Sequence, residues 1–190
     1  MFDVKKALQI ILFFARNSNK KGEVKYIKVL KLLFLADKLF LKRYGTTISG
    51  DHYVAMKLWP VASWVFNVMK EPERFGNLEE KINETIKINA ETKTLQALQD
   101  LDPDYLSELE LATLAEIVKV FGKYSYSKLI DICHSFDEWA KHKNNIWNSC
   151  IPMEFLDFFA PSKWENKIFE MDEDQVALSK VIYQEQAQYV

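Results

Sequence analysis

Residue types that often reveal a protein's class are scarce in this chain of 190 residues, which has two cysteines, five glycines and five prolines. Two cysteines cannot build the disulfide framework of a small secreted domain. The glycines stand singly along the chain, and none belongs to a loop of the kind that cradles phosphate groups. The sequence therefore gives no sign of a disulfide-stapled fold or of nucleotide binding.

An excess of one charge is also missing, because 25 basic and 27 acidic residues leave a formal net charge of −2. The longest basic cluster, residues 19–21, is too short for the basic stripe of a nucleic-acid-binding protein. The apolar run at 10–15 is too short to cross a membrane, and no small-residue cleavage site follows it. We therefore expect a cytoplasmic protein with no specific nucleic-acid partner and no membrane association.

What the chain does have is apolar material, with 48% hydrophobic and 14% aromatic residues. A chain of this length can bury a sizeable core as one domain, with or without an appended subdomain. Its apolar periodicity predicts a mainly α fold with a small antiparallel β-sheet. The strands are expected near 52–58 and 83–98. Because a lone hairpin is only marginally stable, the 52–58 strand should join it, or helices should cover it.

The central element is expected to be a helix over residues 23–44, surrounded by other helices. It is apolar on most sides and ends at Gly45. Four lysines share one stripe, predicted to be the only wet one: Lys28, Lys31, Lys38 and Lys42. Further helices are predicted at 3–17, 64–70, 136–142 and 173–187, and Ser63 is expected to cap the second of these. Another helix should run from the capping box at 107–110 to Gly122, and the next should begin after Ser125. The last of these either packs on its own core or lies in a partner's groove.

Asp37 is the most unusual residue, because it lies in the most apolar face of the 23–44 helix. A lone buried carboxylate would be costly or would take up a proton, so it needs a partner. Backbone N–H groups of the Gly50-Asp51 turn are one candidate. The side chains that could serve instead are Lys57, His52 and His134. The preferred interpretation is a structural anchor that docks the turn on the helix, and the alternative is a contact with a ligand or toxin.

Residues 31–63 resemble the signature of the Panacea antitoxin domain, the family of SocA-like antitoxins and phage-associated GepA proteins. That signature runs K-L-x-Y-x-A-D, then Y-G, then T-G-D-x-Y-V-A-M-K-x-G-P-V-P-S. The matching positions here are Lys31, Leu32, Phe34, Ala36, Asp37, Tyr44, Gly45, Gly50, Asp51, Tyr53, Val54, Ala55, Met56, Lys57, Pro60, Val61 and Ser63. This block is long and specific.

A weaker second block, residues 106–134, is similar to the later half of the family. Its matching positions are Leu106, Ser107, Glu110, Phe121, Gly122, Ser125, Leu129 and His134. The resemblance thus covers about residues 5–145. The chain departs from the family pattern at Trp59, where glycine is usual, at Ala62, where proline is common, and at Cys133, where threonine is usual.

The resemblance implies a mainly helical domain with a small sheet that binds and neutralises a cognate protein toxin. It suggests a Panacea-like domain over 1–145 and a C-terminal helical extension over 146–190 packed on the same domain. One branch of the family delivers its toxin to a Clp-type protease, so a proteolytic adaptor or phage accessory protein is the alternative. Self-association stays open.

The partner surface is expected around the 50–64 turn, strand and helix start. Its candidate residues are Asp51, Tyr53, Lys57, Trp59, Pro60 and Trp64. The matched positions assigned a structural role are Asp37, Gly45, Gly50 and His134. No catalytic residue and no cofactor is predicted, and a small hydrolase built around Asp37 and His134 is the weakest alternative.

The spacing of the histidines and cysteines gives little support for a metal site or for a catalytic nucleophile. The three histidines and two cysteines form no Cys-x-x-Cys or His-x-x-x-His pair, so no metal site is predicted. Cys133 and His134 are adjacent, and neighbours on a helix point about 100° apart. They therefore do not make a nucleophile and its base.

Overall fold

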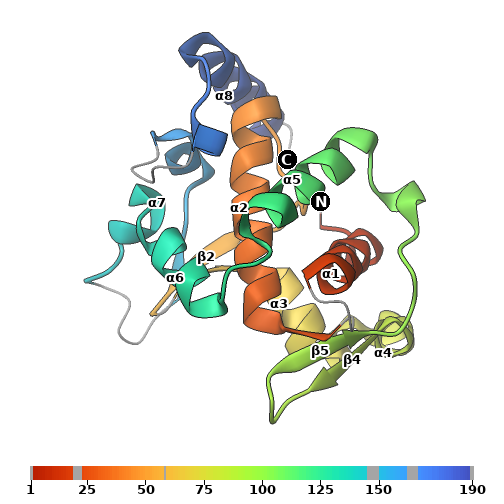
Figure 1. Cartoon of the computed structure of the whole chain (residues 1–190). Coiled ribbons are helices and arrows are strands. Elements are labelled where there is room, and N and C mark those ends of the chain that lie inside the picture. Colours follow the sequence, from red (N-terminus) through yellow and green to blue (C-terminus); the bar gives the residue numbers. More distant parts are fainter. Residues whose placement is uncertain (1, 19–22, 58, 145–149, 162–166, 189–190) are drawn as a thin grey trace.

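The computed structural model describes the whole chain except residues 1, 19–22, 58, 145–149, 162–166 and 189–190 (Figure 1). Helices dominate the described residues, and two small antiparallel sheets of three strands each accompany them. The expected mainly α fold with little sheet is therefore confirmed.

The long helix α2 (Tyr26–Tyr44) runs through the middle of the fold, as Figure 1 shows. Its fifteen buried residues explain why nearly every side of it is apolar. The helices packed on it are α1 (Val4–Ser18), α3 (Ser63–Lys70), α5 (Glu108–Phe121), α6 (Tyr126–His134) and α8 (Glu173–Ala187). The prediction began this helix three residues too early, because residues 23–25 form a strand instead.

The stripe of lysines on α2 is not wet, and that prediction was wrong. Lys31 and Lys38 are fully buried, Lys42 is almost so, and Lys28 is half-buried. Each ammonium group donates a hydrogen bond to a backbone carbonyl oxygen of a distant segment. The bonds run from Lys28 to Gly122 (2.5 Å), from Lys31 to Pro60 (3.0 Å), from Lys38 to Phe158 (2.9 Å) and from Lys42 to Phe169 (2.8 Å). The lysines therefore fasten the surrounding segments to α2.

The first sheet joins β1 (Glu23–Lys25), β5 (Thr94–Ala97) and β4 (Ile86–Asn89), in that order. The hairpin predicted within 83–98 is β4 and β5, with Lys87 opposite Gln96. Its first part was wrong, because residues up to 85 belong to the short helix α4 (Glu79–Thr85), which follows the 3₁₀ segment η1 (Pro72–Leu78). A second 3₁₀ turn, η2 (Pro103–Tyr105), leads into α5.

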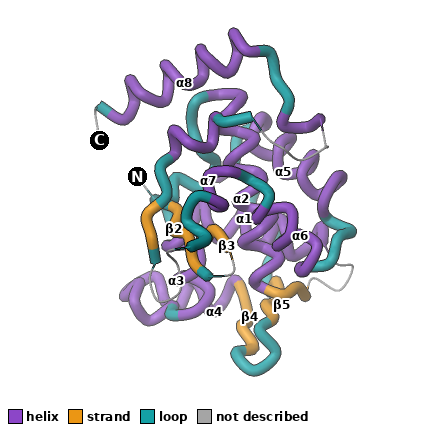
Figure 2. The backbone as a smooth tube through the Cα atoms, turned by 90° about the vertical axis from the view of Figure 1, so that its left-hand side faces the viewer, coloured by secondary structure: helices purple, strands orange, loops and turns teal. Residues whose placement is uncertain are grey.

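The second sheet joins β3 (Trp59–Ala62), β2 (Tyr53–Met56) and β6 (Ile151–Pro152). The predicted 52–58 strand is β2, which is shorter and pairs with β3 and β6 rather than with the hairpin; residue 58 lies outside the described part. Figure 2 shows β2 and β3 apart from the β4–β5 hairpin, which projects at one end of the molecule.

The C-terminal part packs on the same central helix. The short helix α7 (Asp137–Ala140) replaces the longer one predicted at 136–142. The 3₁₀ turns η3 (Phe155–Phe159) and η4 (Lys167–Phe169) contact α2, and α8 lies across its C-terminal end, at the top of Figure 1. The buried ion pair of Lys38 and Glu138, 2.7 Å apart, ties α7 to α2.

Candidate functional site

Asp37 lies at the centre of the motif, fully buried on α2, and both of its carboxylate oxygens are occupied. Oδ1 accepts hydrogen bonds from the backbone N–H groups of Ile48 (2.8 Å) and Ser49 (3.0 Å). Oδ2 accepts a short hydrogen bond from the Ser49 hydroxyl and one of 2.7 Å from the Tyr53 hydroxyl. The carboxylate therefore holds the turn after α2, and the start of β2, against the helix.

Two opposing effects act on the pKa of Asp37. Burial penalises the charged form and is the larger effect, whereas the hydrogen bonds from Ser49, Tyr53 and Ile48 favour it. The result is a pKa raised from 3.8 to about 6. The same burial, with the nearby Asp37 charge, raises the pKa of the Tyr53 hydroxyl well above its ordinary value.

The turn itself depends on glycine at two positions. Gly45 ends α2 with a φ of +73°, and its N–H donates to the Leu41 carbonyl at 2.9 Å. Gly50 has a φ of +61°, and its N–H donates to the Thr47 hydroxyl. Both values fall in the left-handed region that glycine occupies without a steric penalty. The chain can therefore reverse within a few residues and reach Asp37.

Asp51 holds the next element in place. Its carboxylate accepts hydrogen bonds from the backbone N–H groups of His52 (2.7 Å), Trp64 (3.0 Å) and Val65 (2.8 Å). The prediction of Ser63 as the cap of α3 was wrong, because the N-cap is Ala62, whose side chain offers no acceptor. Asp51, which lies more than ten residues earlier in the chain, accepts hydrogen bonds from N–H groups in the first turn of α3 instead. Burial raises the pKa of Asp51, although these bonds oppose the rise.

The structure divides the six residues expected at a partner surface. Asp51, Tyr53 and Pro60 are buried, whereas Lys57 and Trp64 are exposed. Trp59 lies in β3, but its side chain is outside the described part of the structure.

Of the other matched residues, His134 stacks on Trp139, with ring centroids 3.7 Å apart. The partners of Asp37 are thus the N–H groups of Ile48 and Ser49 and two hydroxyl groups, not Lys57, His52 or His134. The N–H groups of Gly50 and Asp51, which were expected to serve, donate instead to the hydroxyl groups of Thr47 and Ser49.

Trp64 is the centre of a group of rings at the surface that spacing did not reveal; Trp64 and His52 are exposed, and Phe2 and Phe75 are half-buried. Its side chain is 43% exposed and stacks on Phe2, with centroids 6.1 Å apart. It also meets Phe75 edge-on at 6.2 Å and His52 at 6.0 Å. We call Phe2, His52, Trp64 and Phe75 the aromatic patch. The four come from α3, η1 and two segments without regular structure, so no local pattern in the sequence could have grouped them.

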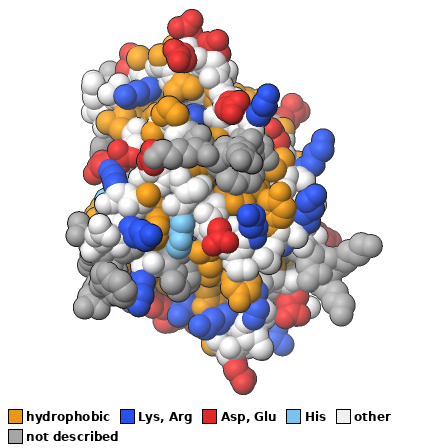
Figure 3. Space-filling view, turned by 60° about the vertical axis from the view of Figure 1, so that its left-hand side comes forward, with side chains coloured by type: hydrophobic (Ala, Val, Ile, Leu, Met, Phe, Trp, Pro, Cys, Tyr) orange, Lys and Arg blue, Asp and Glu red, His pale blue; other side chains and the backbone are white. Residues whose placement is uncertain are grey.

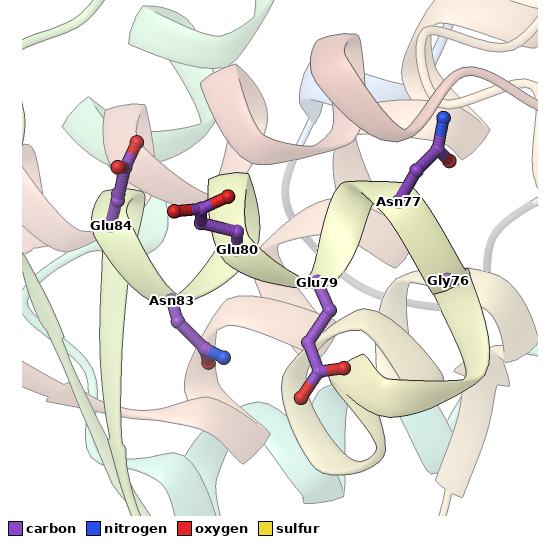
Figure 4. Close-up of a pocket in the computed structure, with 6 residues that line it drawn as sticks. All are labelled: Gly76, Asn77, Glu79, Glu80, Asn83 and Glu84. Carbon is purple, nitrogen blue, oxygen red and sulfur yellow. The ribbon is translucent and has the colours of Figure 1, made fainter.

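Two hollows lie near these elements. One, of about 420 Å³, lies between the turn and α8 and is lined by Thr46, Thr47, Gly50, Asp51, Phe155, Tyr183, Gln186 and Ala187. The other, of about 600 Å³, is open and acidic and lies on η1 and α4, where Figure 4 shows Glu79, Glu80 and Glu84 with Asn77 and Asn83 around it.

Two further properties concern the described residues alone. No three of their histidine, cysteine, aspartate or glutamate side chains converge closely enough to hold a metal ion. None of their helices combines the length and the apolar character needed to cross a membrane.

Comparison with known proteins supplies the family. The sequence profile described as antitoxin SocA-like, Panacea domain, matches residues 29–140. No curated protein and no solved structure matches the chain. The matched range holds all but the first three residues of α2, the Asp37 turn, β2, β3 and α3, together with the capping box that starts α5. Because it covers more than half of the 190 residues, the chain belongs to the SocA-like antitoxin family that carries the Panacea domain.

Proposed function

We propose that this chain neutralises a cognate protein toxin by binding it directly, through a surface centred on the aromatic patch. The observation that carries this proposal is Trp64, a large ring left 43% exposed and held in place by Phe2 and Phe75 within the domain that matches the antitoxin family. Tryptophan is enriched among the residues that dominate binding energy at protein interfaces. A stable complex would bury roughly 800 Å² on each partner.

The rigid motif beneath the patch supports this role. Asp51 fixes the N-terminus of α3, and therefore the backbone of Trp64, through hydrogen bonds to Trp64 and Val65. Asp37 fixes the turn that carries Asp51. A ring that is already ordered loses little conformational entropy on binding, which favours affinity. The buried carboxylates thus prepare the surface without touching the partner.

A catalytic role for Asp37 finds no support in its geometry. Its side chain is fully buried, and both oxygens already accept hydrogen bonds from Ile48, Ser49 and Tyr53. His134, the other residue considered for a hydrolase, is stacked on Trp139 instead of reaching Asp37. A substrate would need access to these groups, so binding is the better interpretation.

Co-expression tests the proposal. The reading frame next to this gene is induced with and without this chain, and growth is measured. If the neighbour is toxic, the wild-type chain should restore growth. Trp64→Ala should weaken binding at least about tenfold in isothermal titration calorimetry, as expected for an interface hot spot. Tyr126→Ala is the matched control, because that ring is 48% exposed on a different helix.

Two results would overturn the proposal: a toxic neighbour that the wild-type chain neither binds nor neutralises, or equal binding by Trp64→Ala and Tyr126→Ala. The adaptor alternative predicts a different fate for the partner. Its half-life would fall when this chain is present and recover in cells that lack the Clp-type protease, whereas masking by direct binding leaves the partner intact.

A further inference from the structure

Helix α8 carries apolar side chains on two opposite faces. The inner face packs on the body through Val176 and Tyr183, and it buries Ser179 almost completely. On the outer face Ala177, Leu178 and Val181 are exposed, with Leu178 at 62% and Val181 at 49%. A surface helix normally has one apolar stripe, directed at its own core, so the second stripe calls for a covering surface. We call Ala177, Leu178 and Val181 the α8 ridge.

The ridge lies on a helix that packs closely against the end of α2. A Cβ atom added at Gly45 would lie only 2.5 Å from the Ser179 carbonyl oxygen and 2.8 Å from Ile182 Cβ, so α8 crosses the end of α2 at close range. Hydrophobic side chains gather on the surface at the end of the molecule where α8 lies, as the upper part of Figure 3 shows. Scattered apolar residues on a surface need no explanation, but three neighbours on one helix face form a patch.

Carboxylates bracket the ridge at both ends. Asp174 lies four residues before Leu178, and Glu185 lies four residues after Val181. Residues four apart share a helix face, so both exposed carboxylates flank the apolar pair. The surface that covers the ridge should therefore be an apolar groove with a basic rim, because charge complementarity guides partner choice.

A second copy of this chain fits poorly. If two α8 helices packed antiparallel with Leu178 of one on Val181 of the other, Asp174 of each would face Glu185 of the other, since each carboxylate lies four residues outside the pair. A parallel pair about a two-fold axis would place each carboxylate against its own counterpart. Both arrangements bring like charges together, which costs free energy.

The position of α8 connects the ridge to the surface proposed above. The hollow of about 420 Å³ is lined on one side by Gly50 and Asp51 of the turn and on the other by Tyr183, Gln186 and Ala187 of α8. The C-terminal end of α8 therefore lies beside the turn from which His52 of the aromatic patch follows. Helix α8 also lies outside residues 29–140, the range that matches the family.

We propose that the α8 ridge inserts into an apolar, basic-rimmed groove of the cognate toxin, and so extends the toxin-binding surface beyond the family domain. The proposal rests on the proposed function. It assigns to the segment after residue 140 a direct role in choosing the partner: a toxin without such a groove would leave Leu178 and Val181 in water and Asp174 and Glu185 without counter-charges.

The test compares two helix-surface variants in the presence of the neighbouring reading frame's product. Leu178→Lys combined with Val181→Lys removes the apolar pair and places positive charge against the expected basic rim. Leu109→Lys is the matched control, because Leu109 is 54% exposed on α5. Circular dichroism first establishes that both variants fold. The double variant should bind the product at least about tenfold more weakly and fail to restore growth, and the control should behave as wild type.

A second variant tests the charges alone. Asp174→Lys combined with Glu185→Lys should also weaken binding and should reduce its dependence on salt, because screening acts on the exposed charges. If the wild type neutralises the product and each double variant binds it as tightly as the wild type does, the ridge proposal is overturned while the proposed function stands. If the wild type itself neither binds nor neutralises, both fail. A wild-type dimer in light scattering that Leu178→Lys with Val181→Lys dissolves would also overturn the proposal, since the ridge would then face a second copy.

Discussion

Replacing Asp37 with asparagine separates the two effects that act on this buried carboxylate. Asparagine has the same shape and keeps an oxygen that can accept from the N–H groups of Ile48 and Ser49. Its amide N–H₂ group would face the hydroxyl groups of Ser49 and Tyr53, which can turn to accept. The variant therefore preserves the turn but removes the charge and the titration.

The magnitude follows from the pKa of Asp37, which burial raises from 3.8 to about 6. Because the folded state keeps this proton at a pH where the unfolded chain has released it, stability falls as pH rises from about 4 to about 6. Two pKa units correspond to about 3 kcal/mol. This loss of folding free energy, which comes from ionising the buried carboxyl group, is absent below about pH 4 and complete at about pH 7. Asparagine does not ionise, so the variant does not suffer this loss at any of these pH values.

The assay is urea unfolding of the wild type and of Asp37→Asn at several pH values. Subtracting one free energy of unfolding from the other cancels the titration of groups that both proteins share. The free energy of unfolding of the variant, relative to that of the wild type, should rise by about 3 kcal/mol between about pH 4 and about pH 7. A difference that does not change with pH, or one that changes in favour of the wild type, would refute the reasoning, since the hydrogen bonds would then equal or outweigh the effect of burial.

Three other changes have defined outcomes. Gly45→Ala should lower the free energy of unfolding by about 1–3 kcal/mol or more and speed hydrogen exchange in α8, because alanine is strained at a φ of +73° and its Cβ would lie 2.5 Å from the Ser179 carbonyl oxygen of α8. Gly76→Ala is the control: φ there is +55° and, adjacent residues aside, no atom of the described part of the chain lies within 4 Å of the added Cβ, so the free energy of unfolding should fall only by the backbone strain. Glu138→Ala should lower the free energy of unfolding by about 3–5 kcal/mol, and pairing it with Lys38→Met should recover much of the loss, since no buried charge is then left alone. Asp51→Ala should cost about 1–3 kcal/mol in thermal unfolding, because backbone N–H groups at the start of α3 lose their acceptor.

Local signals in the sequence predicted the elements well where the physics is local. Gly45 ends α2 because the left-handed conformation there suits glycine, and the capping box of Ser107 and Glu110 starts α5 as its pattern predicts. Apolar periodicity placed most of the helices. Boundaries failed where a neighbour in space decided them: residues 23–25 became a strand because β5 lies beside them.

The lysines of α2 show why pattern alone misjudged the surface. A polar stripe on an apolar helix normally faces water. Whether it does so depends on what lies opposite, and here carbonyl groups such as those of Phe158 and Phe169 accept hydrogen bonds from Lys38 and Lys42. Burial lowers the pKa of Lys31 to about 7 and that of Lys42 to about 8, a consequence that no spacing rule reveals.

The division of the chain into a domain over 1–145 and an extension over 146–190 stays a prediction.

By itself, the sequence determined the family, through a pattern that runs over residues 29–140. It also determined the end of α2 at Gly45, the start of α5 at its capping box and the burial of Asp37, because each of these depends on residue type and on neighbours within a few positions. The tertiary structure decided which groups satisfy Asp37, how β2 pairs, and where Asp51 acts. It also brought the rings of the aromatic patch together and turned one apolar stripe of α8 outward. These features depend on contacts between residues far apart in the chain, and such contacts exist only once the core has closed around α2.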